Sequence, residues 1–140
     1  MRRQIVLLVT FISSTSLATP KDVIAVMKES QTSRENLSKE KDSAKKLEKL
    51  KEFEKSLSAT LQDYEKENPE EGGDAEEKVA KFSYRFEPVF ELATKKITKA
   101  ACDKTKGRIE LEDRSGKTED ADLSDAAKEA LKWVDVICTK

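Results

Sequence analysis

Histidine is absent from this chain of 140 residues, and its absence removes several kinds of active site. Ser-His-Asp and Cys-His nucleophile systems need an imidazole, as do His-ligated haem and the usual zinc sites. The two cysteines, Cys102 and Cys138, are too few for a four-cysteine zinc site. We therefore expect no cofactor, and any bound metal would have to be a hard cation held by oxygen atoms.

Long apolar runs are also missing. The longest runs from Ile5 to Ile12 and is interrupted by Thr10, whereas a membrane-spanning helix needs about 20 apolar residues. It follows Arg2 and Arg3 and ends in small residues up to Ala18, a pattern typical of a cleavable signal peptide. The sequence predicts a signal peptide over 1–18, a single helical domain over 19–140 and no membrane span. The alternative is a buried N-terminal strand or helix.

An excess of positive charge is missing as well. Removing Arg2 and Arg3 from 27 basic side chains leaves 25 against 28 acidic ones, a side-chain net charge of −3. General nucleic-acid binding depends on a clear basic excess, so we expect no nucleic-acid partner. No second long apolar segment follows the signal peptide, so the sequence predicts a soluble mature protein that is periplasmic or secreted.

Two cysteines in an exported chain predict a disulfide between Cys102 and Cys138. In the chain-entropy model, closing a loop of about 35 residues stabilises the fold by about 3–4 kcal/mol. The alternatives are two free thiols or an intermolecular bond. The pair is not a CxxC motif, so a redox-catalytic role is not expected.

Two segments have the apolar spacing of core-facing helices. The turn-forming sequence from Asn68 to Gly73 separates them, so we expect an antiparallel hairpin of helices over about 33–67 and 75–102, with a kink near Pro88. The two stripes are Leu47, Leu50, Phe53, Leu57, Leu61 and Tyr64, and then Val79, Phe82, Phe86, Val89, Phe90, Ala93, Ile97 and Ala100.

The C-terminal part predicts one more helix, capped by Ser124 and reaching Cys138. Gly107 is typical of a helix end, and 103–123 is expected to be a long polar connector, with a strand at 108–112 left open. Cys102 and Cys138 are both expected near the C-terminal ends of their helices, so a disulfide between them would make the two helices parallel. The fold class predicted is an all-α bundle of three or four helices, with a long antiparallel hairpin and a disulfide-tethered C-terminal helix.

The N-terminal part of the mature chain is weakly anchored in this scheme. Thr19 and Pro20 indicate a helix start, and Thr32 with Glu35 is a capping box that either begins a second helix or lies within one long helix. Segment 21–46 could dock on the bundle, stay mobile, bind a partner or swap into a second copy, which would give a homodimer. Val23 and Met27, within an apolar group that also contains Ile24 and Val26, are therefore candidate partner contacts.

A second candidate partner contact lies within the aromatic segment around Pro88. Tyr84, Pro88 and Glu91 share the side of the helix opposite Phe82, Phe86 and Phe90. An exposed tyrosine beside a proline is a plausible anchor for another protein. The alternative is an ordinary surface tyrosine.

Basic residues gather just after this segment, and they form a candidate contact for anions on an envelope component. Favourable interaction with the negative end of a helix dipole would also account for them. The group consists of Lys95, Lys96, Lys99, Lys104, Lys106 and Arg108.

These observations lead to one main functional hypothesis and two alternatives. The main hypothesis is an exported, non-enzymatic helical binding or accessory protein whose partner is another protein or an envelope component. The first alternative is a periplasmic helical chaperone or envelope-stress protein. The second is an enzyme that uses carboxylates to act on cell-wall or glycan polymers. The sequence assigns no catalytic residue.

Overall fold

The computed structural model describes residues 20–66, 69–115 and 121–139, so the predicted signal peptide lies outside the described residues. Within them the protein is all-α, which confirms the predicted fold class, and it has five helices and no strand. The fifth arises because part of the expected connector is helical. The helices are α2 (Val23–Ser38), α3 (Ser43–Lys66), α4 (Pro69–Leu92), α5 (Lys99–Ser115) and α6 (Ala121–Cys138).

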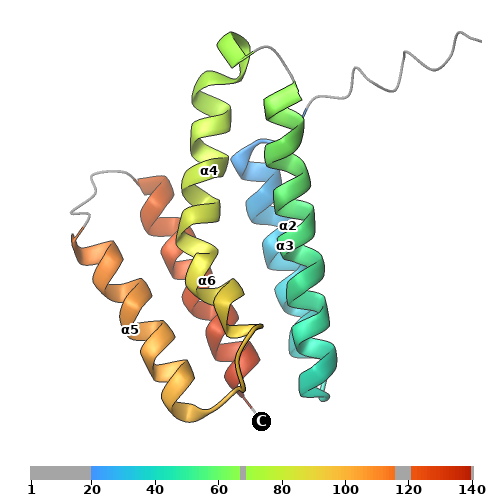
Figure 1. The fold of residues 1–140 in the computed structure, drawn as a ribbon, viewed down its shortest axis with the longest axis vertical. Helices are drawn as coiled ribbons and strands as arrows, with labels where there is room; N and C mark the ends of the chain where they lie inside the picture. The colour runs from blue at the N-terminus through green and yellow to red at the C-terminus, as the bar shows by residue number, and fades with distance from the viewer. Residues whose placement is uncertain (1–19, 67–68, 116–120, 140) are drawn as a thin grey trace, which may run out of the picture.

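The helices alternate in direction along one bundle (Figure 1). α2, α4 and α6 run one way, and α3 and α5 run the opposite way. α3 and α4 form the predicted antiparallel hairpin. α6 packs against α2, α3, α4 and α5, whereas α5 contacts only α4 and α6 among the described helices.

The centre of the bundle is aromatic. Phe53 of α3 stacks on Trp133 of α6 at a centroid separation of 5.0 Å, and Phe82 stacks on Phe86 of α4 at 4.6 Å. Phe90 completes the cluster, with its ring 5.8 Å from that of Phe86. Trp133, Phe82 and Phe86 are almost fully buried, so the central parts of the predicted apolar stripes face each other. The last part of the second stripe, Ala93, Ile97 and Ala100, lies beyond the end of α4.

Several predicted helix boundaries were wrong, and local capping explains why. α2 begins after Asp22, whose carboxylate accepts a hydrogen bond from the Ala25 backbone N–H at 2.8 Å, rather than at Pro20. α2 and α3 are separate helices, because Asp42 caps α3 by accepting from the Ala44 N–H at 3.0 Å. Thr32 and Glu35 therefore lie inside α2, and Ser124 lies inside α6.

The second helix of the hairpin is shorter than predicted. α4 ends at Leu92 in a tight turn, where Ala93 and Thr94 donate to the carbonyls three residues before them. Its backbone departs from helical geometry at Gly73 (φ 22°, ψ −110°), a conformation that glycine tolerates, rather than near Pro88 as expected. The helix continues through Pro88.

The predicted connector was wrong for residues 103–115, which form most of α5. Gly107 lies within this helix, and the strand left open at 108–112 is helical. Thr98 caps α5 by accepting from the Ala101 N–H at 3.1 Å. Residues 116–120 of the predicted connector lie outside the described residues.

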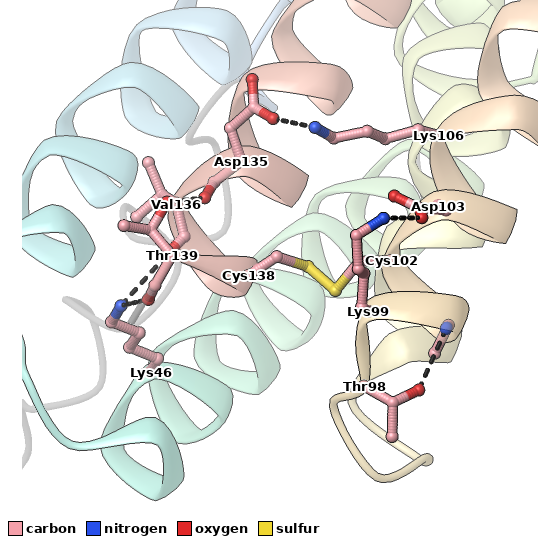
Figure 2. The surroundings of a disulfide bond; sticks show 11 residues. Lys46, Thr98, Lys99, Cys102, Asp103, Lys106, Asp135, Val136, Cys138 and Thr139 are labelled. Atoms are coloured by element: carbon pink, nitrogen blue, oxygen red, sulfur yellow. Dashed lines mark hydrogen bonds and ion pairs between the residues drawn. A yellow bond between two sulfur atoms is a disulfide. The ribbon is translucent and has the colours of Figure 1, made fainter.

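The disulfide between Cys102 and Cys138 is present, with their Cα atoms 6.3 Å apart. Figure 2 shows that it joins the first turn of α5 to the last residue of α6. Cys102 thus lies at the start of a helix rather than at the end of one, so the two linked helices are antiparallel and the expected parallel arrangement is wrong. A disulfide is typical of chains in oxidising compartments.

Lys46 fixes the end of α6 from the other side. Its ammonium group donates to the carbonyls of Val136 (3.1 Å) and Thr139 (2.9 Å), although its side chain is largely buried (Figure 2). A cation at these carbonyls offsets the negative end of the helix dipole. None of the described helices is long and apolar enough to cross a membrane.

Candidate protein-docking groove

An open groove of about 400 Å³ lies between the start of α2 and the start of α6. Three apolar side chains of α2 form its wall, and polar or charged groups edge it. We call this the α2 groove, and it is lined by Val23, Ile24, Met27, Lys28, Gln31 and Asp125.

The inner face of α2 holds this helix on the bundle. Val26 and Leu37 are buried in the common core, and Ser30 is fully buried with them. Successive residues of a helix are rotated by about 100°, so Ile24 lies about 160° from Val26 and points away from that core. Segment 21–46 is therefore docked, and its outward apolar side chains border the groove.

Polar contacts fix the first turn of α2. The Tyr64 hydroxyl of α3 donates to the Lys21 carbonyl at 2.8 Å. Glu29 accepts from Lys21 at 2.8 Å and from the Ser56 hydroxyl at 2.5 Å. Burial raises the pKa of the Glu29 carboxyl, but hydrogen bonds from Lys21 and Ser56 outweigh it and lower the pKa overall.

A buried polar network then sets α2 against α6. The Trp133 indole N–H donates to the Ser30 hydroxyl at 2.7 Å, and this hydroxyl donates to Glu129 at 3.2 Å. Arg34 closes the network through its Nε, which donates to the same carboxylate at 2.8 Å. Glu129 is 3 % exposed, so the charge that it carries is neutralised by this pairing rather than by water. The network gives α2 one defined position and rotation on α6.

The groove surface is apolar in the middle and charged at its edges. Ile24 is 76 % exposed, and Val23 and Met27 are half-buried beside it. Lys28 projects from α2, while Asp125 projects from the first turns of α6 with Lys128 4.0 Å from its carboxylate. Single exposed apolar residues are common on proteins, but three that line one concave surface are typical of a contact site.

Val23 and Met27, the candidate partner contacts, both line this groove together with Ile24 of the same apolar group, whereas Gln31 and Asp125 were not selected from the sequence. The sequence did contain a signal for Ile24, because a helix places it about 160° from Val26, so the two side chains cannot both face the core. An amphipathic helix with one stray apolar residue on its outer face has a second apolar surface. The contribution of α6 through Asp125 had no such signal, because it depends on how two distant segments pack.

The other candidate partner contact is divided by the fold. Tyr84 is 55 % exposed, with the Arg85 guanidinium 5.9 Å from its ring centroid. Pro88 was expected beside it on the surface, but it is fully buried. Glu91 is bound by Arg108 of α5 at 2.7 Å. The expected patch of Tyr84, Pro88 and Glu91 is therefore not a continuous free surface, because α5 covers this side of α4.

The predicted anion contact is also divided. Lys99 pairs with Asp103 at 2.7 Å, Lys106 pairs with Asp135, and Arg108 bridges Glu91 and Glu112. The hydrogen bond from Lys99 lowers the pKa of Asp103, and the hydrogen bond to Asp135 raises the pKa of Lys106. Lys95, Lys96 and Lys104 are exposed and make no ion pair with the described residues.

One shallow groove of about 220 Å³ contains two carboxylates, Glu29 and Glu52, between α2 and α3. A general acid for glycoside cleavage needs a raised pKa, whereas the pKa of Glu29 is lowered. Across the described part of the chain, no group of three or more His, Cys, Asp or Glu residues is placed to hold a metal ion.

Comparisons with protein-family models, with curated proteins and with solved structures found no match for this chain.

Proposed function

We propose that this chain is an exported, non-enzymatic binding protein that takes the apolar face of a partner protein's helix in the α2 groove. The observation that carries the proposal is the side chain of Ile24, which is 76 % exposed and lines the α2 groove together with Val23 and Met27. Burying an exposed isoleucine at a contact contributes about 1.5–3 kcal/mol, which favours a partner over solvent.

The dimensions and charges of the groove favour a helix as the occupant. Val23, Ile24 and Met27 lie within about one helical turn and offer a compact set of apolar contacts to the apolar stripe of an amphipathic helix. Lys28 lies on one edge and Asp125 on the other. A partner helix with an acidic residue on one side of its apolar stripe and a basic residue on the other is complementary to this arrangement.

Export is supported by the signal-like residues 1–18 and by the disulfide between Cys102 and Cys138. Processing after Ala18 would leave Thr19 as the first residue, only four positions before Val23. The α2 groove would then lie beside the N-terminus of the mature protein. Intact mass measurement of the protein from its source cells should give a chain that begins at Thr19, and retention of Met1 would overturn the export part of the proposal.

Site-specific photo-cross-linking tests the docking part. A photoreactive residue replaces Ile24 in the full chain expressed in its source cells, and the matched control replaces Leu111, which is 64 % exposed on α5, a helix whose described residues do not contact α2. We expect Ile24 to cross-link to a helical segment of one partner protein, and Leu111 to give no such product. The cross-linked peptide is identified by mass spectrometry.

Binding of that segment as a synthetic peptide then provides the quantitative check. Ile24→Asp should weaken the peptide affinity by at least about tenfold, because a charge replaces a buried apolar contact. Leu111→Asp should leave it unchanged. Cross-links from Ile24 to many unrelated unfolded proteins would instead indicate a chaperone, and cross-links to a second copy would indicate a homodimer. Either outcome would overturn the single-partner proposal.

A further inference from the structure

A second groove, of about 290 Å³, lies on the opposite side of the bundle between the end of α4 and the first turns of α5. It is independent of the α2 groove. One wall comes from α4 and from the turn that follows it, and the other comes from α5. We call it the α4–α5 groove, and it is lined by Pro88, Glu91, Lys95, Ala101, Lys104, Thr105 and Arg108.

The charges around this groove are unequal. Arg108 is satisfied by Glu91 at 2.7 Å and by Glu112 at 3.2 Å. Lys95 and Lys104 make no ion pair with any described residue, although both line the groove. The lining therefore contains three cations and a single carboxylate, so it is positive in a protein whose net charge is −1.

A buried cation next to the groove increases this imbalance. Arg85 lies one helical turn before Pro88 and is 4 % exposed, and its Nε has no hydrogen-bond partner. Its nearest carboxylate is that of Glu112 at 3.9 Å, which already accepts from Arg108. A buried guanidinium that is incompletely paired is costly, and nearby negative charge reduces that cost.

We propose that the α4–α5 groove binds an oxyanion, such as a phosphate or sulfate group, through the ammonium groups of Lys95 and Lys104. Lys95 lines the groove from the turn after α4 and Lys104 lines it from α5, so the groove offers an anion cations from two different elements. The Thr105 hydroxyl lies on the same wall as Lys104. The bound anion neutralises the excess positive charge beside Arg85 and Arg108.

Titration followed by amide chemical shifts tests this site on the mature, disulfide-bonded protein. The probes are inorganic phosphate, inorganic sulfate and a sulfated disaccharide, each added at constant ionic strength against sodium chloride, because salt alone screens exposed charges. We expect saturable shifts confined to residues around the groove. A tighter constant for the disaccharide would indicate a sugar ester as the source, and equal constants would indicate the free anion; both support the site.

The variants Lys95→Gln and Lys104→Gln should each weaken binding by about tenfold, because each removes one charged donor. Lys45→Gln is the matched control, since Lys45 is an exposed lysine on α3 away from the groove. Shifts that do not saturate would overturn the proposal. So would an equal loss of binding in the Lys45→Gln variant, because it would show attraction to net charge rather than to a site.

Discussion

Helices α5 and α6 lie side by side and share a disulfide, but the rest of the protein holds them by different means. α6 contributes six buried apolar residues to the core and contacts four other helices. Among the described residues of α5, only Cys102 and Ile109 are buried. The buried apolar residues of α6 are Ala126, Ala127, Ala130, Trp133, Val134 and Ile137.

Ion pairs and the disulfide are the main attachments of α5 to the rest of the bundle. Lys106 pairs with Asp135 of α6, and Arg108 pairs with Glu91 of α4. Exposed ion pairs of this kind contribute about 0–1 kcal/mol each. A highly charged helix with few apolar residues can thus be part of a small fold when a disulfide fixes one of its ends. We expect α5 to unfold locally more readily than α6. The following substitutions test that difference.

The largest effect is expected from Trp133→Ala in α6. Truncating a buried tryptophan costs about 3–5 kcal/mol, and here it also leaves the Ser30 hydroxyl without its indole donor. The free energy of unfolding is measured in urea by circular dichroism, because Trp133 is the only tryptophan and its fluorescence is lost. A loss below about 1 kcal/mol would mean that α6 is not the central helix described here.

The next effect is expected from replacing both cysteines by serine. Opening a loop of this length should cost about 3–4 kcal/mol, chiefly because the unfolded chain gains freedom. Native-state hydrogen exchange should show that the amides of α5 lose more protection than those of α6, because α5 has few other anchors. Equal losses in the two helices would contradict the proposed difference between them.

The third effect concerns Ile109, the one large apolar side chain of α5 that is fully buried among its described residues. Ile109→Ala should destabilise the protein by about 2–4 kcal/mol through lost burial and the resulting cavity. Leu111→Ala on the same helix is the matched control, since Leu111 is exposed. Its unfolding free energy should stay within about 0.5 kcal/mol of the wild type. A large effect at Leu111 would show that α5 buries a second face.

The smallest effect is expected from Lys106→Gln, which removes the ion pair with Asp135. The loss should be at most about 1 kcal/mol, because both side chains are partly exposed. The hydrogen bond to Asp135 raises the pKa of Lys106 above its usual 10.5, so the contribution is full below 10.5 and is lost as pH rises through the folded-state pKa. The stability difference between wild type and variant should therefore disappear in strongly alkaline urea titrations and persist near neutral pH.

The same contrast explains which parts of the fold could be predicted from the sequence. Leu50, Phe53 and Leu57 recur at spacings of three and four residues, and so do Phe82 and Phe86, so the α3–α4 hairpin could be predicted. α5 was not, because its stability depends on Cys102 and on partners in other helices. Gly107 lies inside it, and the alternation of Ile109 and Leu111 resembles a strand.

The candidate site was only partly predictable for a related reason. Val23 and Met27 are apolar residues in a polar neighbourhood, which the sequence shows directly. Whether such residues are free depends on what packs over them, and the sequence does not show this. Pro88 illustrates the point, because it was expected at the surface and is fully buried. Asp125 became a candidate only through α2, which packs beside it.

The bond between Cys102 and Cys138 also makes α5, α6 and the segment between them a closed covalent ring. A protease that cuts the backbone once within this ring produces no separate fragment, since both halves remain attached through sulfur. The nicked halves stay at high effective concentration and can re-form the α5–α6 contact. A single cut in α5 would therefore leave the broken peptide bond unsealed but would not release α5 from the bundle.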